Sequence, residues 1–236
     1  MSIQVGGLQV PVSVIIPAAG RGTRMGGETA KQFLPLCGEP VLVHTVRLFS
    51  QSPLVDEIVI AAEDLERTRE LVGAMPKVSR IVPGGAERQD SVWAALQVVH
   101  SRPRILCIHD AVRPLLPVSV LEGVLEAAAR YPAQVVAVPV KDTIKVAGPD
   151  GVVTATPDRS TLWAVQTPQV FWAGVLIPAY RKAMAEGYRG TDDASLVERT
   201  GQAVRIYPGS AENLKLTTPE DLAVAETILA RRRQGR

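Results

Sequence analysis

Short apolar runs rich in β-branched residues alternate along the chain with segments that have helical periodicity. The apolar runs predict strands at residues 12–18, 55–62, 79–85, 104–110, 133–140 and 204–210. The intervening segments predict helices at 40–51, 63–75, 90–100, 118–130 and 218–233. Strands that alternate with helices form right-handed crossover units. The pattern therefore predicts an α/β fold with a mostly parallel, doubly wound sheet and helices on both faces.

The alternation of strands and helices breaks between residues 141 and 166. Polar and apolar residues alternate there around a Gly-Pro-Asp-Gly turn at 148–151, which predicts a β-hairpin. A hairpin inserted into a parallel sheet has few strands to pair with in its own domain, and its open edges favour docking on another chain. We therefore expect an arm that packs on a second subunit.

Composition limits the classes of protein that fit. The chain has 236 residues, of which 46% are apolar and 21% charged, as in one ordinary globular domain. A net charge of +2 does not favour a nucleic-acid partner. Cys37 and Cys107 lie far apart, and Cys107 is inside an apolar run, so we expect no disulfide framework. Because no basic residue precedes Arg21 and no apolar run approaches ~20 residues, we expect a cytoplasmic protein with no membrane partner.

A glycine-rich stretch, VIIPAAGRGTRMGG, follows the first predicted strand at residues 14–27. It lacks the third glycine of a dinucleotide fingerprint, where Met25 stands, and Lys31 is followed by Gln32 rather than the Ser or Thr of a P-loop. What remains is a loop whose backbone amides, with Arg24 and Lys31, could wrap a triphosphate. The alternative is a plain turn with solvated arginines.

Two further segments predict ligand contacts at the carboxyl ends of strands. Asp110 ends the most apolar strand, where ligands bind in open α/β sheets, and it could hold Mg²⁺ while Arg113 contacts a phosphate. The segment GGAERQDSV at 84–92 suits close backbone approach to a base or ribose, with Arg88 and Ser91 as contacts. The alternatives are helix caps and surface arginines.

Lys215 stands between two leucines near the C-terminus. A lysine in this setting either snorkels to solvent or holds its ammonium in a partly dry site. Lysine is a compact point charge that can follow a changing phosphate geometry, so a role in phosphate chemistry is one interpretation. The segment TDDAS at 191–195 predicts the start of a helix, and its spacing does not decide whether it contacts a ligand.

Together, these segments resemble one enzyme family, the 2-C-methyl-D-erythritol 4-phosphate cytidylyltransferases of the non-mevalonate isoprenoid pathway. The resemblance runs from residue 14 to about 226 and rests on seven segments in the family's order: PAAGRGTRMG…KQFLPL, GGAERQDSV, HDAVRP, PVKDTIK, DRSTLWAVQTPQ, TDDAS and NLKLTTPEDL. It implies a Rossmann-like nucleotidyltransferase fold with a protruding β-arm that joins a homodimer. It implies one domain at 11–232, with the arm at about 141–166 and a disordered extension at 1–10.

The resemblance also implies roles for individual residues. As nucleotide ligands it implies Ala18, Ala19, Gly20, Arg24, Lys31, Gly85, Arg88 and Ser91. For the polyol phosphate it implies Asp110, Arg113, Thr143, Arg159 and Thr191, with Thr143 and Arg159 reaching the site from the neighbouring subunit. It implies Lys31, Lys215 and Arg24 in catalysis and Asp110 as the ligand of Mg²⁺ or another divalent cation.

The reaction that the resemblance implies is transfer of CMP from CTP to 2-C-methyl-D-erythritol 4-phosphate, with release of pyrophosphate. A related cytidylyltransferase that acts on ribitol 5-phosphate is the nearest alternative, because its nucleotide motifs are similar. A Rossmann oxidoreductase is disfavoured by the failed dinucleotide fingerprint. A nucleotide-binding module without turnover is disfavoured by the presence of both lysines and Asp110.

Overall fold

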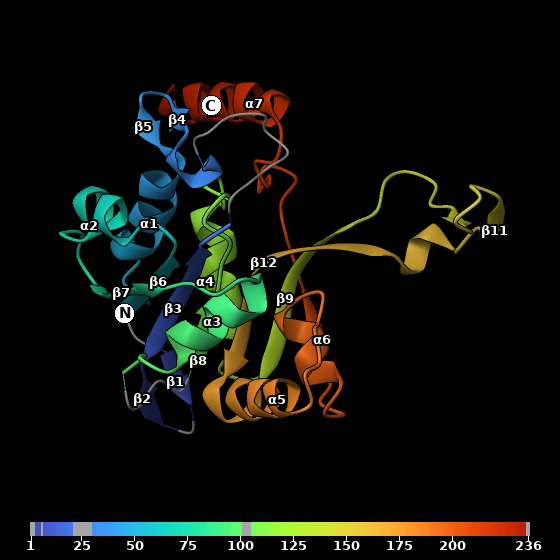
Figure 1. Ribbon diagram of the computed structural model, residues 1–236, viewed down its shortest axis with the longest axis horizontal. Coiled ribbons are helices and arrows are strands. Elements are labelled where there is room, and N and C mark those ends of the chain that lie inside the picture. Colours follow the sequence, from blue (N-terminus) through green and yellow to red (C-terminus); the bar gives the residue numbers. More distant parts are fainter. Residues whose placement is uncertain (1–2, 6, 21–29, 101–104, 235–236) are drawn as a thin grey trace.

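The computed structural model describes residues 3–5, 7–20, 30–100 and 105–234. Its centre is a seven-stranded sheet (Figure 1). In spatial order the strands are β13 (Arg205–Pro208), β9 (Ala133–Pro139), β12 (Trp163–Trp172), β8 (Ile105–Ile108), β3 (Val12–Ala18), β6 (Glu57–Ala62) and β7 (Val78–Pro83). β12 is antiparallel to β8 and β9, and the other neighbours pair in parallel. The predicted mostly parallel sheet is confirmed.

Successive residues of the central strand β3 supply the cores on opposite faces of the sheet. Val14 and Ile16 belong to one buried cluster, and Ile15 belongs to another. The first cluster includes residues of α1 (Val41–Gln51), α2 (Leu65–Val72) and α4 (Val118–Ala127). The second includes residues of α3 (Arg88–Leu96), α5 (Ala173–Ala185) and α6 (Asp193–Glu198). Helices therefore cover both faces, as the alternating sequence pattern predicts.

The last helix, α7 (Pro219–Arg233), packs on a small hairpin instead of the sheet. Thr218 is its N-cap and accepts a hydrogen bond from the backbone N–H of Asp221, and Pro219 occupies the first turn. The hairpin consists of β4 (Pro35–Leu36) and β5 (Glu39–Pro40), which follow the turn η2 (Lys31–Phe33). Leu36 and Leu216 share a buried cluster with Ala225 of α7. This packing fixes the segment that carries Lys215.

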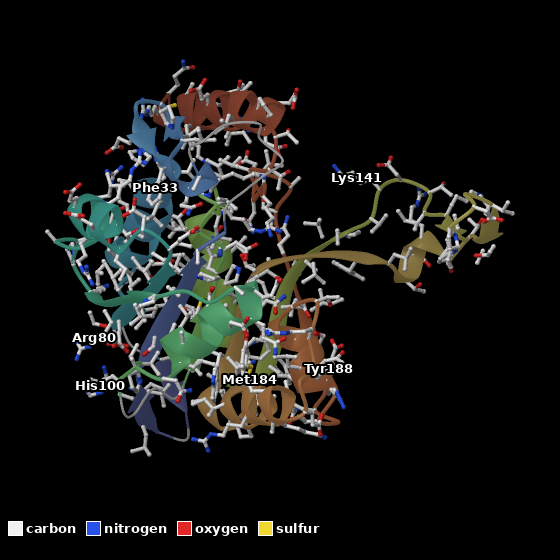
Figure 2. The ribbon with its side chains drawn as sticks, in the orientation of Figure 1. Phe33, Arg80, His100, Lys141, Met184 and Tyr188 are labelled. Atoms are coloured by element: carbon white, nitrogen blue, oxygen red, sulfur yellow. The ribbon has the colours of Figure 1, made fainter. Side chains whose placement is uncertain are left out.

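The segment between β9 and β12 forms an arm that extends away from the body (Figures 1 and 2). Its tip is an antiparallel hairpin of β10 (Val146–Ala147) and β11 (Val153–Ala155), followed by the turn η3 (Arg159–Thr161). The predicted hairpin is thus confirmed. Figure 2 shows the side chains of the arm, with Lys141 labelled, standing clear of the main body. Several apolar arm residues are exposed: Ile144, Val146, Val152, Val153, Trp163 and Val165.

Several parts of the chain differ from the sequence prediction. Within the predicted disordered extension, β1 (Ile3–Val5) pairs antiparallel with β2 (Leu8–Val10), and Ile3 and Val10 are buried in the main core. The β4–β5 hairpin, strand β12 and helix α5 were not predicted. Within the described residues, no helix is long and apolar enough to cross a membrane.

Candidate active site

A cavity of about 250 Å³ opens at the carboxyl ends of β3 and β8. It brings together predicted residues that are widely separated in sequence: Ala18, Ala19, Gly20, Lys31, Gly85, Arg88, Ser91, Asp110 and Lys215. This is the edge at which open α/β sheets bind ligands. Of the residues expected to contact the nucleotide, Arg24 lies outside the described residues.

The two glycines after β7 bring the backbone close to its neighbours. A Cβ atom added to Gly84 would lie 2.2 Å from the Cβ of Ala19, and one added to Gly85 would lie 2.2 Å from the Cβ of Asp90. Ser91 Oγ accepts a hydrogen bond from the N–H of Gly85 at 3.1 Å and donates to the carbonyl of Glu87 at 3.1 Å. Only glycine fits these two positions without displacing a neighbour. Ser91 therefore orders the glycine loop that lines the cavity.

Lys31 approaches the cavity from the turn η2. Its side chain is buried, and its Nζ donates to the backbone carbonyl of Thr217 at 2.8 Å. The neighbouring Gln32 anchors the same turn, because its Nε2 donates to the carbonyl of Ala18 at 2.7 Å. The turn is thus tied both to the end of β3 and to the segment before α7. This arrangement holds a buried ammonium beside the cavity.

Asp110, which follows β8, is surrounded by three cationic side chains. Its Oδ1 lies 3.1 Å from Nε of Arg88, and its Oδ2 lies 3.0 Å from Nζ of Lys215 and 3.5 Å from Nε of Arg113. Burial alone would raise the pKa of this carboxyl, but Arg88, Lys215 and Arg113 outweigh burial and hold the pKa well below its usual range. Asp110 is therefore ionised at neutral pH, in a site whose net charge is positive.

A hydrogen-bonded chain that the sequence did not reveal lies behind Asp110. The N–H of Asp110 donates to Oγ1 of Thr167 at 3.0 Å, and that hydroxyl lies 3.1 Å from Nδ1 of His109. The Nε2 of His109 lies 3.0 Å from the carbonyl of Arg113, which fits the tautomer protonated on Nε2. Burial lowers the pKa of His109 to about 4, so the ring is neutral at pH 7.

A second cavity, of about 350 Å³, adjoins the first and shares Arg88, Asp110 and Lys215 with it. Arg113 and Thr191, both predicted to contact substrate, line it as well. Sequence reasoning did not single out its other polar residues, which are Gln166, Thr167, Gln169 and Asp192. Amide and hydroxyl groups of this kind suit a substrate that carries several hydroxyls. The segments DRSTLWAVQTPQ and TDDAS, quoted above for the family resemblance, contain all four.

Asn213 connects the second cavity to the segment of Lys215. Its side chain is fully buried, and Nδ2 donates to the carbonyl of Thr167 at 2.8 Å and to Oε1 of Gln166 at 3.1 Å. The backbone carbonyl of Asn213 accepts a hydrogen bond from Nη1 of Arg113 at 2.8 Å. Through these bonds the position of Lys215, two residues later, is coupled to the residues that line the cavity.

The two predicted substrate residues on the arm lie apart from the site in this chain. Thr143 and Arg159 are exposed and line neither of the two cavities described above. Nη1 of Arg159 donates to the carbonyl of Lys141 at 2.7 Å, within the arm itself. Their delivery to a site on another subunit stays a prediction.

Comparison with known proteins places this chain among cytidylyltransferases. The family model described as 2-C-methyl-D-erythritol 4-phosphate cytidylyltransferase matches residues 12–231. The enzyme of that name from Symbiobacterium thermophilum is 75% identical over 229 residues, which cover 97% of this chain and 97% of that protein. Its namesake from Pelotomaculum thermopropionicum is 47% identical over 231 residues, covering 95% and 96%.

The fold agrees with a solved structure from the same group of enzymes. The crystal structure of 4-diphosphocytidyl-2C-methyl-D-erythritol synthase from Anaerococcus prevotii superposes with a TM-score of 0.83 at 28% identity, covering 94% of this chain and 99% of that one. The likeness thus extends over nearly the whole length of both chains. The chain therefore belongs to the 2-C-methyl-D-erythritol 4-phosphate cytidylyltransferase family, whose members transfer a cytidylyl group from CTP in isoprenoid biosynthesis.

Proposed function

We propose that the first cavity binds CTP, that the second binds 2-C-methyl-D-erythritol 4-phosphate, and that CMP transfer occurs where they meet. The observation that carries this assignment is the set of residues common to both cavities: Arg88, Asp110 and Lys215. Two substrates in adjoining cavities present their reacting groups to the same charged cluster. Such positioning supplies a large share of catalysis when two anions must approach each other.

The proposed step is attack by a phosphate oxygen of the polyol phosphate on the α-phosphate of CTP. One P–O bond forms at the α-phosphorus and the bond to the β-phosphate oxygen breaks, so pyrophosphate leaves. The attacking phosphate is already an anion at neutral pH, so the step needs no general base. The side chains that matter are then cations that lower the repulsion and stabilise the transition state.

The cations of the site divide between its two halves. Lys31 lines the first cavity but not the second, so we assign it to the triphosphate. Arg113 lines the second cavity but not the first, so we assign it to the polyol phosphate. Lys215 lines both, so we assign it to the α-phosphate where charge accumulates. Arg24 completes the triphosphate contacts in the proposal.

Asp110 is the residue that would hold a divalent cation. Its carboxylate is ionised and stands at the junction of the cavities. Within the described residues, no three His, Cys, Asp or Glu side chains form a group that could bind a metal, so the remaining ligands would be phosphate oxygens and water. That donor set suits Mg²⁺, which binds through one or two carboxylates and substrate phosphates. When bound, Mg²⁺ neutralises phosphate charge.

We further propose that the chain works as a homodimer in which each arm completes the partner's second cavity. The exposed apolar residues of the arm and the exposed Arg159 support this proposal. An isolated two-stranded arm is marginal in water, so a partner would stabilise it. A two-fold dimer would present both arms equally.

The test is pyrophosphate release with each of the four ribonucleoside triphosphates and Mg²⁺. Each is paired with 2-C-methyl-D-erythritol 4-phosphate or with ribitol 5-phosphate, the polyol of the alternative activity. We expect release with CTP and the erythritol phosphate. Preference for ribitol 5-phosphate would overturn the substrate assignment, and CTP binding without release would overturn the catalytic one.

A further inference from the structure

A second buried carboxylate, Asp193, lies behind the active site and contacts one of its cations. Asp193 is the first residue of α6, and its side chain has no exposed surface. Its Oδ2 lies 2.8 Å from Nη2 of Arg88, and its Oδ1 accepts a hydrogen bond from the hydroxyl of Tyr180. A buried carboxylate is costly unless it is paired, and here one cation and one hydroxyl pair it.

Arg88 therefore stands between two carboxylates that have different surroundings. Asp110 faces Nε of Arg88 and lines both active-site cavities, whereas Asp193 faces Nη2 of Arg88 and lines neither of these two cavities. Burial alone would lower the pKa of Arg88, but Asp193 and Asp110 outweigh burial and raise the pKa above its usual range. The guanidinium is thus held in a fixed plane by one anion within the site and another behind it.

Tyr180 supports Asp193 in a fixed position. The Tyr180 ring is buried and stacks on Trp93, with ring centroids 6.1 Å apart and an angle of 4° between the planes. Trp93 belongs to α3, the helix that begins at Arg88. Burial raises the pKa of Tyr180 well above its ordinary value, and the Asp193 charge adds to this, so the hydroxyl remains a donor. Three elements, α3, α5 and α6, thus converge on this carboxylate.

We propose that Asp193, supported by Tyr180, is a positioning residue that retains Arg88 at the junction of the cavities while Asp110 exchanges its cationic partners. The proposal rests on the proposed function, since Asp110 must release Arg88 or Lys215 to engage substrate or metal. Without a second anion, Arg88 would follow the remaining charge. With Asp193 in place, its guanidinium stays aligned with the reacting groups.

The alternative is a purely structural role, in which Asp193 only joins α6 to α3 and stabilises the fold. The two readings predict different behaviour in a double-mutant cycle of Arg88→Gln and Asp193→Asn. If Asp193 acts through Arg88, the double variant should have the kcat/KM of Arg88→Gln within about twofold. A purely structural Asp193 predicts losses that multiply.

The double-mutant cycle can be interpreted even where a single variant folds poorly, because the unfolding midpoint of each variant is measured as well. Arg88→Gln leaves the buried Asp193 without its cation, and Asp193→Asn leaves Arg88 with Asp110 as its one remaining anion. The double change removes both charges of this pair, so its unfolding midpoint should recover toward that of the unmodified chain. Val197→Ala is the matched control, because Val197 is buried in the same helix and lines neither described cavity. It should lower stability and leave kcat/KM per folded molecule unchanged.

The expected results are graded. Asp193→Asn should lower kcat/KM by roughly 10- to 100-fold, and Tyr180→Phe should cause a smaller loss because it keeps the ion pair. Calorimetric CTP affinity should fall in Asp193→Asn in the same proportion as in Arg88→Gln. If Asp193→Asn matches Val197→Ala in both measurements, the inference is wrong. Absence of pyrophosphate release by the unmodified chain would instead overturn the proposed function.

Discussion

The ammonium of Lys215 lies 3.0 Å from Oδ2 of Asp110, in the region that both cavities share. The side chain of Lys215 is 45% exposed and that of Asp110 only 9%, so the lysine reaches a buried anion from the open side of the site. In the proposed mechanism, a phosphate of the substrate replaces this carboxylate as the partner of Lys215. The ion pair would then keep the proposed catalytic cation in place before substrate arrives.

Replacing Lys31 by alanine should reduce kcat strongly and change the free energy of unfolding only slightly. By analogy with loss of an oxyanion donor, we expect a fall in kcat of roughly 10²–10³. The hydrogen bond from Nζ to the carbonyl of Thr217 is also lost, so a small drop in the unfolding midpoint should accompany it. The control is Lys182→Ala, an exposed lysine on α5. Activity that simply follows the folded fraction would make Lys31 structural.

CTP should be strongly preferred over UTP. Cytosine carries an amino donor where uracil carries an acceptor, and a site built around that donor leaves buried groups unpaired with the wrong base. We expect kcat/KM for CTP to exceed that for UTP by at least roughly 100-fold. The measurement is pyrophosphate release at subsaturating nucleotide with saturating polyol phosphate. If kcat/KM for CTP and for UTP differ by only a few fold, the glycine loop does not recognise the base.

The neutral His109 behind Asp110 should make stability depend on pH. Its folded-state pKa of about 4 lies below the unfolded value of about 6.5, so between these values the unfolded chain binds the extra proton. The contribution of the neutral His109 to the free energy of unfolding is therefore fully present above pH ~6.5. It decreases as the pH falls toward ~4, by up to about 3 kcal/mol.

The test compares the unmodified chain with His109→Gln, which keeps a donor for the carbonyl of Arg113. Denaturant unfolding at a series of pH values gives the free energy of unfolding of each chain. The difference between the two should shrink as the pH is lowered from ~6.5 to ~4. A difference that stays constant over this range would show that His109 is not buried in its neutral form.

The arm can be tested by mixing inactive subunits. If Arg159 acts on the partner's site and Lys215 on its own, Arg159→Ala and Lys215→Ala homodimers should both be nearly inactive. A heterodimer should regain one complete site, because the Arg159→Ala chain keeps its own Lys215 and receives an intact arm. Random mixing should restore roughly a quarter of the sites of the unmodified dimer. No recovery after verified exchange would place Arg159 outside the partner's site.

The sequence predicted the parts of the molecule that local patterns determine. Periodicity and turn residues within a few positions predict strand β3, the hairpin tip of the arm and the last helix, α7. The prediction of disorder in the N-terminal segment was wrong for Ile3 and Val10, because their burial depends on a core that only the folded chain supplies. Strand β12 was missed, since its first three residues are exposed at the base of the arm and the next six are buried in the sheet.

The same distinction applies to the active site. Asp110 and Lys215 could be chosen from sequence because each lies in a distinctive segment, and the structure brings them together. The contacts of Thr167 with Asp110 and His109 join positions 57 and 58 residues apart, which no local pattern indicates. The pairing of Asp193 with Arg88 spans 105 residues and has the same origin. Supporting residues of this kind are defined by tertiary packing.

In the proposed mechanism, Lys215 stabilises charge at the α-phosphate where the two cavities meet. The decisive experiment is a single-turnover assay of Lys215→Ala saturated with CTP, Mg²⁺ and the erythritol phosphate, with Lys215→Arg as the charge-conserving variant. We expect the rate of pyrophosphate release to fall by roughly 10²–10³ while calorimetric CTP affinity changes by less than about tenfold. Lys215→Arg should recover only part of the rate, because a planar guanidinium follows the changing phosphate less well. An unchanged single-turnover rate in Lys215→Ala would show that Lys215 does not stabilise this charge.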